Sequence, residues 1–353
     1  MEHRAIQKVF VRAPNWLGDV VMATPAFARI RSMYMQAEIV CGIKPSLRAV
    51  LSGQKAFDRF FDWTRVRSPL DLWRRTRALR AERFDLAIVL THSLSSLLPV
   101  WLAGIPERVG YLHDGRSLFL TRGLYARKER LQRQWGPKRL PVPMVEYYFQ
   151  LLDLLGMPRV GPAPLLRVSA DEEARAAQRL AQLGVAPGER YFVVNVGAAF
   201  GSSKLWPTER FAETAARLSQ RTGARGVLLA GPGEEPLVLA VAAQARVPLL
   251  PAIDPVFPLD VLKAVIKNAL LMLTGDTGPR HLAVAFQVPV VVLMGPTDPR
   301  YTAANLERTR VVRHDVPCGP CHLKVCPLDH ACMQQVTVDE AVAAACALLD
   351  RPA

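Results

Sequence analysis

The feature that most constrains the fold is a glycine-containing turn between two apolar runs in the second half of the chain. The runs are Ala269–Leu273 and Val288–Met294; between them lie Thr-Gly-Asp-Thr-Gly-Pro-Arg-His at 274–281 and a short helical pattern. A strand, a tight turn, a helix and a second strand make a parallel βαβ unit. Glycines let the backbone approach a ligand, and the free amides at a helix start favour an anion. We therefore expect a nucleotide diphosphate at this turn; the alternative is an ordinary turn capped by Asp276 or Thr277.

Strands and helices alternate in the same way along the rest of the chain. The strands that we predict before this unit are Lys8–Arg12, Glu38–Cys41, Phe57–Phe61, Leu86–Leu90, Arg108–Tyr111, Tyr191–Val196 and Gly226–Ala230. Such alternation predicts parallel, doubly wound sheets. A length of 353 residues suggests about two domains, and the Pro- and Gly-rich segment Gly156–Pro164 is the natural linker. We predict an α/β protein with two Rossmann-like domains, 1–160 and 161–353, and a cleft facing the carboxyl ends of both sheets.

Three further segments bear on the organisation of the chain. Gly115–Pro143 is basic and shows no period, so we expect a long active-site or acceptor loop there. Val338–Leu349 is predicted as a final amphipathic helix that can pack back on the N-terminal domain. Leu86–Ile105 is interrupted by serines and a proline, and the N-terminus has no long apolar region. We therefore expect a cytoplasmic chain without a transmembrane segment.

The positive charge of the chain is concentrated in its first half. Residues 1–160 contain 26 Lys and Arg against 13 Asp and Glu, whereas residues 161–353 contain 19 against 18. Many of these basic residues are arginines in Arg59–Arg83 and Arg116–Arg139, and arginine favours phosphates and carboxylates. This half could face nucleic acid, an anionic membrane or an acidic acceptor; a solvated basic face is the simpler alternative.

Two clusters that follow predicted strands contain carboxylates suited to chemistry. Asn15–Asp19 follows the first strand and places Asp19 at a helix start, where it could act as a general base or simply cap the helix. Gly231–Glu235 follows a later strand, and Glu234 or Glu235 could bind ribose hydroxyls or only complement the helix dipole.

Two other clusters contain groups suited to a diphosphate. Gly197–Pro207 is rich in glycine and serine and includes Lys204, although it lacks the spacing of a Walker A sequence. Lys204 could neutralise a diphosphate or be a solvated loop lysine. The turn described first contributes Asp276, Thr277 and Gly278, and His281 lies one helical turn beyond Thr277 on the same side.

Two absent motifs narrow the chemistry. The chain has no Asp-x-Asp pair, so we expect amides and Lys204, without a metal, to stabilise a departing diphosphate. It also has no G-x-G-x-x-G sequence after the first strand, which argues against a dehydrogenase.

Four cysteines lie close together near the C-terminus: Cys318, Cys321, Cys326 and Cys332. Four thiols could hold zinc tetrahedrally, but the spacing is not that of matched C-x2-C pairs. We favour packed free thiols and predict no metal.

Several motifs together resemble one known family. They are Arg12–Asp19 with Met22–Pro25, Gly197–Pro207, Gly275–Gly278 with His281–Ala283, Gly295–Asp298, and the cysteine tail Cys318–Met333. Their order over nearly the whole chain resembles that of the family 9 glycosyltransferases. Leu205 and Gly278-Pro-Arg280 depart from the family pattern, but neither departure removes a proposed functional residue.

The resemblance implies a GT-B architecture, in which the N-terminal domain binds the acceptor and the C-terminal domain binds a nucleotide sugar. It implies inverting transfer of heptose from ADP-heptose to the first heptose of the lipopolysaccharide inner core, with no cofactor. Asp19 would then be the base, and Lys204 with the amides of Thr277 and Gly278 would bind the diphosphate. Further roles implied by the resemblance are donor orientation by Asp276 and His281, adenine packing by Phe257, and acceptor contacts by Asn15, Arg116 and Arg122.

The resemblance also implies the partners. An acceptor that carries Kdo carboxylates and phosphates suits the basic N-terminal half, as does a peripheral position on the anionic inner face of the cytoplasmic membrane. We expect a monomer that does not bind nucleic acid. Two alternatives remain: another sugar-nucleotide transferase of heptosyltransferase I or III type or an epimerase, and a basic nucleic-acid-binding protein, which would lack a recognition helix here.

Overall fold

The chain forms two compact units, each built around its own sheet. The computed structural model describes residues 6–113, 115–128, 135–136 and 140–350. The first unit contains the described residues up to 128 and from 140 to 167; the second contains 135–136 and the residues from 168 onward. The change at 167–168 comes a few residues after the linker expected at Gly156–Pro164.

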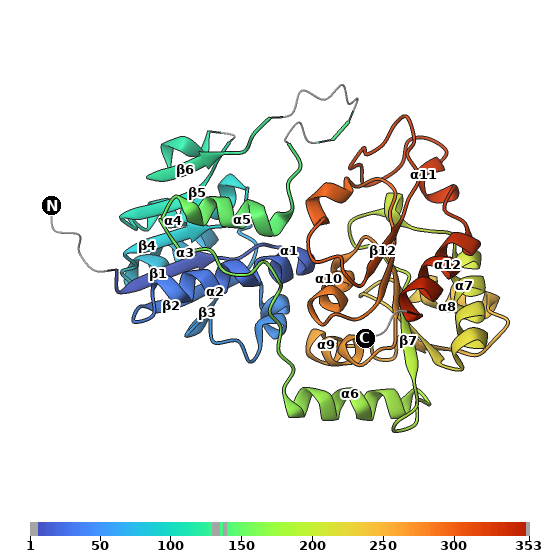
Figure 1. The fold of residues 1–353 in the computed structure, drawn as a ribbon. Helices are drawn as coiled ribbons and strands as arrows, with labels where there is room; N and C mark the ends of the chain where they lie inside the picture. The colour runs from blue at the N-terminus through green and yellow to red at the C-terminus, as the bar shows by residue number, and fades with distance from the viewer. Residues whose placement is uncertain (1–5, 114, 129–134, 137–139, 351–353) are drawn as a thin grey trace. The chain divides into compact units, whose positions relative to one another are not determined.

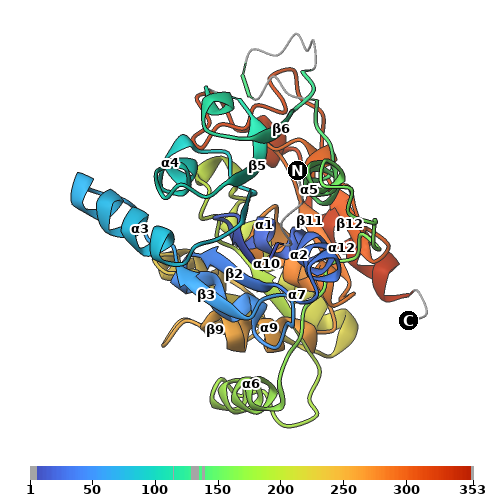
Figure 2. The ribbon, with the colours of Figure 1, turned by 90° about the vertical axis from the view of Figure 1, so that its left-hand side faces the viewer.

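Unit 1 is a six-stranded parallel sheet in the order β3-β2-β1-β4-β5-β6 (Figure 1). Figure 2 shows α3 and α4 on one side of this sheet and α2 and α5 on the other. The elements of unit 1 are β1 (Lys8–Arg12), α1 (Leu17–Met22), α2 (Thr24–Met33), β2 (Glu38–Ile43), the 3-10 helix η1 (Pro45–Leu51), β3 (Arg59–Asp62), α3 (Pro69–Ala81), β4 (Leu86–Val89), α4 (Leu94–Leu102), β5 (Glu107–Leu112), the 3-10 helix η2 (Arg116–Leu118), β6 (Arg122–Tyr125) and α5 (Met144–Asp153).

Strand β1 is the centre of this sheet because its side chains are apolar on both faces. Val9, Phe10 and Val11 are fully buried, as expected for a strand with helices above and below it. Val9 lies beside Ile39 of β2 on one side and Leu86 of β4 on the other. The sheet therefore changes winding direction at β1, and the loops after β1 and β4 leave it at the same edge.

Unit 2 repeats this topology, with the strand order β12-β11-β10-β7-β8-β9, all parallel. Its elements are α6 (Ala170–Gln182), β7 (Tyr191–Asn195), the 3-10 helix η3 (Ser202–Lys204), α7 (Thr208–Thr222), β8 (Arg225–Leu229), α8 (Glu235–Gln244), β9 (Leu249–Ala252), α9 (Leu259–Lys267), β10 (Met272–Gly275), α10 (Gly278–Ala285), β11 (Val290–Leu293), the 3-10 helix η4 (Pro299–Thr302), β12 (Thr309–Val312), α11 (Ala331–Gln334) and α12 (Val338–Leu349). The predicted pair of doubly wound domains is confirmed.

The final helix packs within its own unit. Helix α12 lies against α7, β11 and β12 of unit 2. Its apolar face, formed by Ala341, Ala345 and Leu348, belongs to the hydrophobic core of that unit. A helix with one apolar stripe covers one surface, and unit 2 provides it.

The predicted elements differ from the structure mainly at the sheet edges. Strand β6 lies within Gly115–Pro143, which we expected to be a loop throughout. Its sequence, Arg-Gly-Leu-Tyr, is partly exposed, as an edge strand can be, so it shows no apolar run. The helix expected from Asp19 is two helices, α1 and α2, the second with a proline in its first turn. Among the described residues, no helix is both long and apolar enough to span a bilayer.

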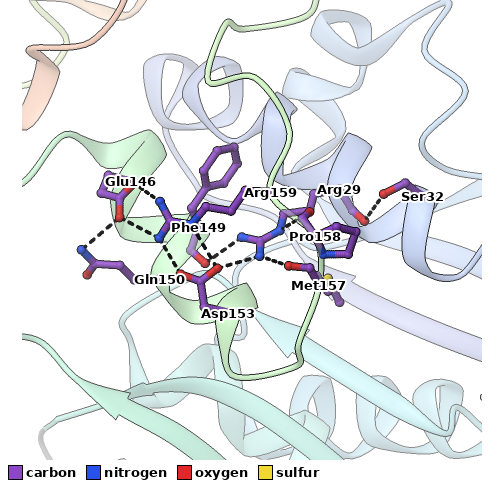
Figure 3. Close-up of polar contacts among 9 residues, drawn as sticks. All are labelled: Arg29, Ser32, Glu146, Phe149, Gln150, Asp153, Met157, Pro158 and Arg159. Carbon is purple, nitrogen blue, oxygen red and sulfur yellow. Dashed lines mark hydrogen bonds and ion pairs between the residues drawn. The ribbon is translucent and has the colours of Figure 1, made fainter.

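A buried arginine ties the segment after α5 to α2. Figure 3 shows the guanidinium of Arg29 between α5 and residues 157–158. It is fully buried and donates to the carbonyl oxygens of Phe149 (3.0 Å), Pro158 (2.9 Å) and Met157, and to Asp153 Oδ1 (2.6 Å). Arg159, half exposed, reaches Asp153 and Glu146 from outside (Figure 3). One side chain thus binds the carbonyl oxygens of Met157 and Pro158, which lie outside any helix or strand, and ties them to α5.

Arg29→Met is expected to lower the free energy of unfolding by about 3 kcal/mol, because buried carbonyls lose their donor. Arg159→Met is the matched control, because it removes another partner of the same carboxylate at the surface; we expect a loss of less than about 1 kcal/mol. Urea denaturation of both variants measures the difference. Equal losses would contradict the assignment of Arg29 as the buried anchor.

Candidate active site

Each sheet has a point where the winding direction changes, and ligands of doubly wound folds bind outside the carboxyl ends of the strands there. In unit 1 this point lies between β1 and β4, and in unit 2 between β7 and β10. The loop after β1 carries Asn15–Asp19. The loops after β7 and β10 carry Lys204 and Asp276. Three of the predicted clusters therefore lie where this fold binds ligands.

Asp19 lies in the first turn of α1, half-buried, above the end of β1. The N-cap of this helix is Trp16, so the alternative in which Asp19 caps the helix is wrong. The side chain lies near α5, where burial and then the Asp19 charge raise the pKa of the Tyr148 hydroxyl well above its usual value. Asp19 thus places a carboxylate on a rigid helical turn at the carboxyl edge of the sheet, which is the placement that a general base requires.

The three arginine and asparagine side chains expected at the acceptor do not lie together. Asn15 accepts a hydrogen bond from the Arg12 guanidinium at the end of β1. Arg116 is fully buried near the ends of β4 and β5 and donates to the Thr91 carbonyl oxygen at 2.8 Å. Arg122 is the first residue of β6 and pairs with Val109 near the start of β5. In a parallel sheet that position is the amino edge, opposite to the edge that carries Asp19.

In unit 2 the structure brings Lys204 and Asp276 into direct contact. Lys204 Nζ donates to Asp276 Oδ2 at 2.8 Å and to the Asp276 carbonyl oxygen at 2.7 Å. Both side chains are only 10% exposed, so the alternative of a solvated loop lysine is wrong. Arg280 Nη1 donates to Asp276 Oδ1 at 2.6 Å, and Thr297 Oγ1 donates to Oδ2 at 2.6 Å. Two cations and a hydroxyl thus surround one carboxylate.

The charge of this cluster is fixed over the physiological pH range. Burial alone would raise the pKa of Asp276, but the charges of Arg280 and Lys204 and hydrogen bonds from Lys204 and Thr297 outweigh it and hold the pKa far below its usual value. Burial, with the Arg280 charge, lowers the pKa of His281 to about 3, so the imidazole is neutral. The cluster therefore carries a net charge of about +1, which suits an anionic ligand.

The start of α10 leaves backbone donors for that ligand. Its N-cap is Thr277, and no side chain caps the helix; Gly278 is the first helical residue. The Thr277 hydroxyl instead accepts a hydrogen bond from Asn195 Nδ2 of β7 at 3.1 Å. The alternative in which the side chain of Asp276 or Thr277 caps this helix is therefore wrong. Uncapped amides and the positive end of the helix dipole beside a cationic cluster make an anion-binding geometry.

Comparison with known proteins agrees with this geometry. The model of glycosyltransferase family 9 (heptosyltransferase) matches residues 72–332. Lipopolysaccharide heptosyltransferase 2 of Escherichia coli K12 is 27% identical over 325 residues, covering 87% of this chain and 88% of that protein.

The chain belongs to glycosyltransferase family 9. Two solved structures share its fold. The ADP-heptose LPS heptosyltransferase II of E. coli has a TM-score of 0.75, 25% identity and coverage of 97% and 98%. A family 9 glycosyltransferase from Veillonella parvula has a TM-score of 0.83 and shares the fold at 22% identity, covering 97% of each chain. The predicted fold class, with GT-B relatives, and the predicted enzyme class, a glycosyltransferase, are confirmed.

Glu234, Glu235 and Phe257 are the remaining residues expected at the donor site of this glycosyltransferase, and each lies in its own surroundings. Glu234 Oε2 accepts from the Gly231 amide at 2.8 Å, and its carboxylate lies over Gly197, where a Cβ atom would be 1.8 Å from Oε2. Glu234 therefore joins the loops after β7 and β8. Glu235 is the first residue of α8. Phe257 is buried, with the Arg179 guanidinium 5.8 Å from its ring centre.

The cysteine tail of the glycosyltransferase supports the Lys204 loop. Ser203 donates from its amide to the Lys324 carbonyl oxygen at 3.0 Å and from its hydroxyl to the Leu323 carbonyl oxygen at 2.5 Å. His330 Nε2 lies 2.6 Å from the Ser203 carbonyl oxygen. Gly201 is required because a Cβ there would lie 2.3 Å from the Lys324 carbonyl oxygen. The tail thus fixes the position of η3 and of Lys204.

The cysteines themselves are free thiols. Cys321 and Cys332 are buried, and burial raises the pKa of the Cys332 thiol to about 11. Among the described residues, no group of three or more His, Cys, Asp and Glu side chains is arranged to hold a metal ion. At Gly295 a Cβ would lie 2.8 Å from Cys332 Sγ, so this glycine makes room for the tail.

Sequence reasoning missed three residues of the cluster. Arg280 and Thr297 both contact Asp276, and Asn195 binds Thr277 from the neighbouring strand. Arg280 had a signal, because it lies one helical turn after Asp276, the spacing of a helical ion pair. Thr297 lies in the Gly295–Asp298 motif, but nothing in the sequence shows that the turn after β11 reaches the turn after β10.

Proposed function

We propose that this glycosyltransferase is of the heptosyltransferase II type and transfers L-glycero-D-manno-heptose from ADP-heptose to the first heptose of the lipopolysaccharide inner core. The observation that carries the proposal is the buried Lys204–Asp276–Arg280 cluster beside the uncapped start of α10. The similarity to lipopolysaccharide heptosyltransferase 2 of E. coli and to the solved ADP-heptose enzyme supports this choice of donor and reaction.

Unit 2 binds the donor in this proposal. The diphosphate lies at the amides of Thr277 and Gly278, and the ammonium group of Lys204 contacts it. Asp276 holds Lys204 in place, because the two side chains form an ion pair at 2.8 Å. His281 is neutral and so orients the donor as a hydrogen-bonding group, without adding charge. Glu234, Glu235 and Phe257 are proposed contacts of the adenosine part.

Asp19 of unit 1 is the proposed base. The acceptor hydroxyl oxygen forms a bond to the anomeric carbon while the bond from that carbon to the diphosphate oxygen breaks. The hydroxyl proton passes to the Asp19 carboxylate, and ADP leaves with the electron pair. A single displacement of this kind inverts the anomeric configuration. Lys204 and the helix amides stabilise the charge that develops on the leaving group, and the chain needs no further cofactor.

The basic first half suits the acceptor and its membrane. The net charge of residues 1–160 is +13, against +1 for the rest of the chain. The acceptor carries carboxylates and phosphates and is anchored in an anionic leaflet. Each basic residue near such a surface contributes about 1 kcal/mol of attraction. We therefore include peripheral binding to the inner face of the cytoplasmic membrane, by a monomer, in the proposal.

An assay of ADP release tests the proposed donor. The purified enzyme is given an acceptor that ends in the first heptose, together with ADP-heptose, a UDP-sugar or a GDP-sugar. We expect turnover with ADP-heptose to exceed turnover with the UDP- and GDP-sugars by at least about 100-fold, because a nucleobase other than adenine leaves buried polar groups unpaired. Equal turnover with a UDP- or GDP-sugar would exclude the proposed function.

The same assay tests membrane binding when the acceptor is embedded in vesicles. We expect faster transfer on anionic than on neutral vesicles at low salt, with the difference fading as salt is added. Equal rates on both vesicles at low salt would contradict peripheral binding by charge.

A further inference from the structure

An exposed tryptophan lies at the entrance to the Asp19 loop. Trp16 is the N-cap of α1, three residues before Asp19, and is 52% exposed. Tryptophan is large and apolar, and leaving half of it in water forgoes the free energy of burying it. A ligand that covers the indole face would recover this free energy. The C–H face of a sugar ring is a partner of the right size and polarity.

One cation, Lys44, lies beside this tryptophan, and a second, Arg12, contacts the residue before it. Lys44, which follows β2, has its Nζ 5.8 Å from the Trp16 ring centre. Arg12, at the end of β1, is fully buried and donates to Asn15 Oδ1 and to the Gly42 carbonyl oxygen, the latter at 3.1 Å. Because β1 and β2 are adjacent, these groups leave the sheet at the same edge as Asp19.

Within the part of the chain that the structure describes, neither Lys44 nor Arg12 forms an ion pair with a carboxylate, and the acidic neighbour of Arg75 is Asp71 on its own helix. Arg12 and Arg75 lie on Trp63, each with its Cζ 4.6 Å from the ring centre. Among the described residues, no carboxylate forms an ion pair with Arg12, Arg75 or Lys44, and the buried Nε atom of Arg12 has no hydrogen-bond partner. The carboxylate at the end of β3, Asp62, pairs with Arg48 instead.

In the protein without ligand, the positive charges of Arg12 and Lys44 therefore lie close together and are partly removed from water. Burial lowers the pKa of Arg12 to about 9, which still leaves it charged at neutral pH. Lys44 is exposed as a whole, but partial desolvation of its ammonium group and the Arg12 charge lower its pKa as well. Such an arrangement costs free energy unless an anion binds to it.

We propose that Trp16 and Lys44, backed by Arg12, form an acceptor subsite for a sugar that carries an anionic group. The sugar ring packs on the Trp16 indole, and its carboxylate or phosphate binds Lys44. The subsite rests on the proposed function, because its role is to hold the acceptor so that a hydroxyl group meets Asp19. Trp16 and Lys44 are specificity residues of the acceptor, not contacts of the donor.

The test is steady-state kinetics of Trp16→Ala and Lys44→Met with the heptose-terminated acceptor. We expect Trp16→Ala to raise the acceptor KM by about 10-fold, because a stacked aromatic contact is lost. Trp16→Phe should restore most of the acceptor affinity, because phenylalanine keeps an aromatic ring. The KM for ADP-heptose should not change in any of these variants. Trp73→Ala is the control, because Trp73 is also exposed (55%), with the Arg77 guanidinium 5.5 Å from its ring centre, but lies on α3.

Two modified acceptors show whether the anionic group that binds Lys44 is a phosphate or a carboxylate. One acceptor has its phosphates removed, and the other has its carboxyl groups reduced. We expect one of them to bind the wild type about 5-fold more weakly at low salt, and Lys44→Met to abolish that preference. If Lys44→Met discriminates among the acceptors as the wild type does, or if Trp16→Ala behaves like Trp73→Ala, the subsite is excluded. A wild type that does not turn over ADP-heptose would instead overturn the proposed function, so the two failures are distinct.

Discussion

Asp19→Asn lowers kcat for heptose transfer by about 10²- to 10⁴-fold, the contribution of a positioned general base. The substitution keeps the size of the side chain in the first turn of α1 but removes its ability to accept a proton. The KM for ADP-heptose should change little, because in the proposal the donor binds to unit 2. Rapid-quench measurement of a single turnover, together with steady-state ADP release, separates the chemical step from binding.

The matched control for this variant is Asp71→Asn. Asp71 also lies in the first turn of a helix of unit 1, where its carboxylate accepts from the Ser68 amide in the capping box of α3. An asparagine amide oxygen can still accept that bond. We expect wild-type kcat in this control. Full activity in Asp19→Asn would remove Asp19 as the base and leave the donor assignment intact.

Lys204→Met lowers kcat by about 10²- to 10³-fold, the usual effect of losing one group that stabilises charge on a leaving group. Asp276 retains Arg280 at 2.6 Å and Thr297 at 2.6 Å, so the carboxylate is not left without partners and the fold should persist. Lys267→Met is the control, because it breaks a surface pair with Glu173 in the same unit.

Inhibition by ADP, AMP and adenosine shows where Lys204 acts. If its ammonium group binds the diphosphate, Lys204→Met weakens the binding of ADP by more than 10-fold, since a charge-assisted contact of about 1.5 kcal/mol or more is lost. Adenosine has no phosphate, so it should bind the variant and the wild type with the same affinity. If the binding of adenosine were weakened equally, Lys204 would act through the fold of the loop and not on the leaving group.

The architecture could be predicted from the sequence because the central strands are buried on both faces. Val9–Val11 and Val290–Leu293 are continuous apolar runs, and such runs between helical patterns identify a parallel sheet. Edge strands have no such signature. Strand β6 was missed for this reason, and with it the fact that Arg122 lies at the amino edge of the sheet.

The site could be predicted only in part. Lys204 and Asp276 are recognisable because each follows a buried strand in a glycine-containing turn. Their ion pair was not foreseen, because 72 residues separate them and only the adjacency of β7 and β10 brings them together. Trp16 and Lys44 also lie in the segments that follow adjacent strands, and neither residue type suggests a site by itself. Side-chain exposure and unpaired charge are properties of the folded chain.

The hydrogen bonds of Lys204 limit how it can recognise a ligand. An ammonium group has three protons, and two are already directed at the Asp276 carboxylate and carbonyl oxygens. The Phe200 ring, 4.9 Å from Nζ, lines another side of the group. One proton remains, so Lys204 can reach a single phosphate oxygen without giving up its own support. An inhibitor with a singly charged, monodentate group at this point would therefore satisfy the lysine as fully as a phosphate does, and a diphosphate must gain its advantage from the amides of α10.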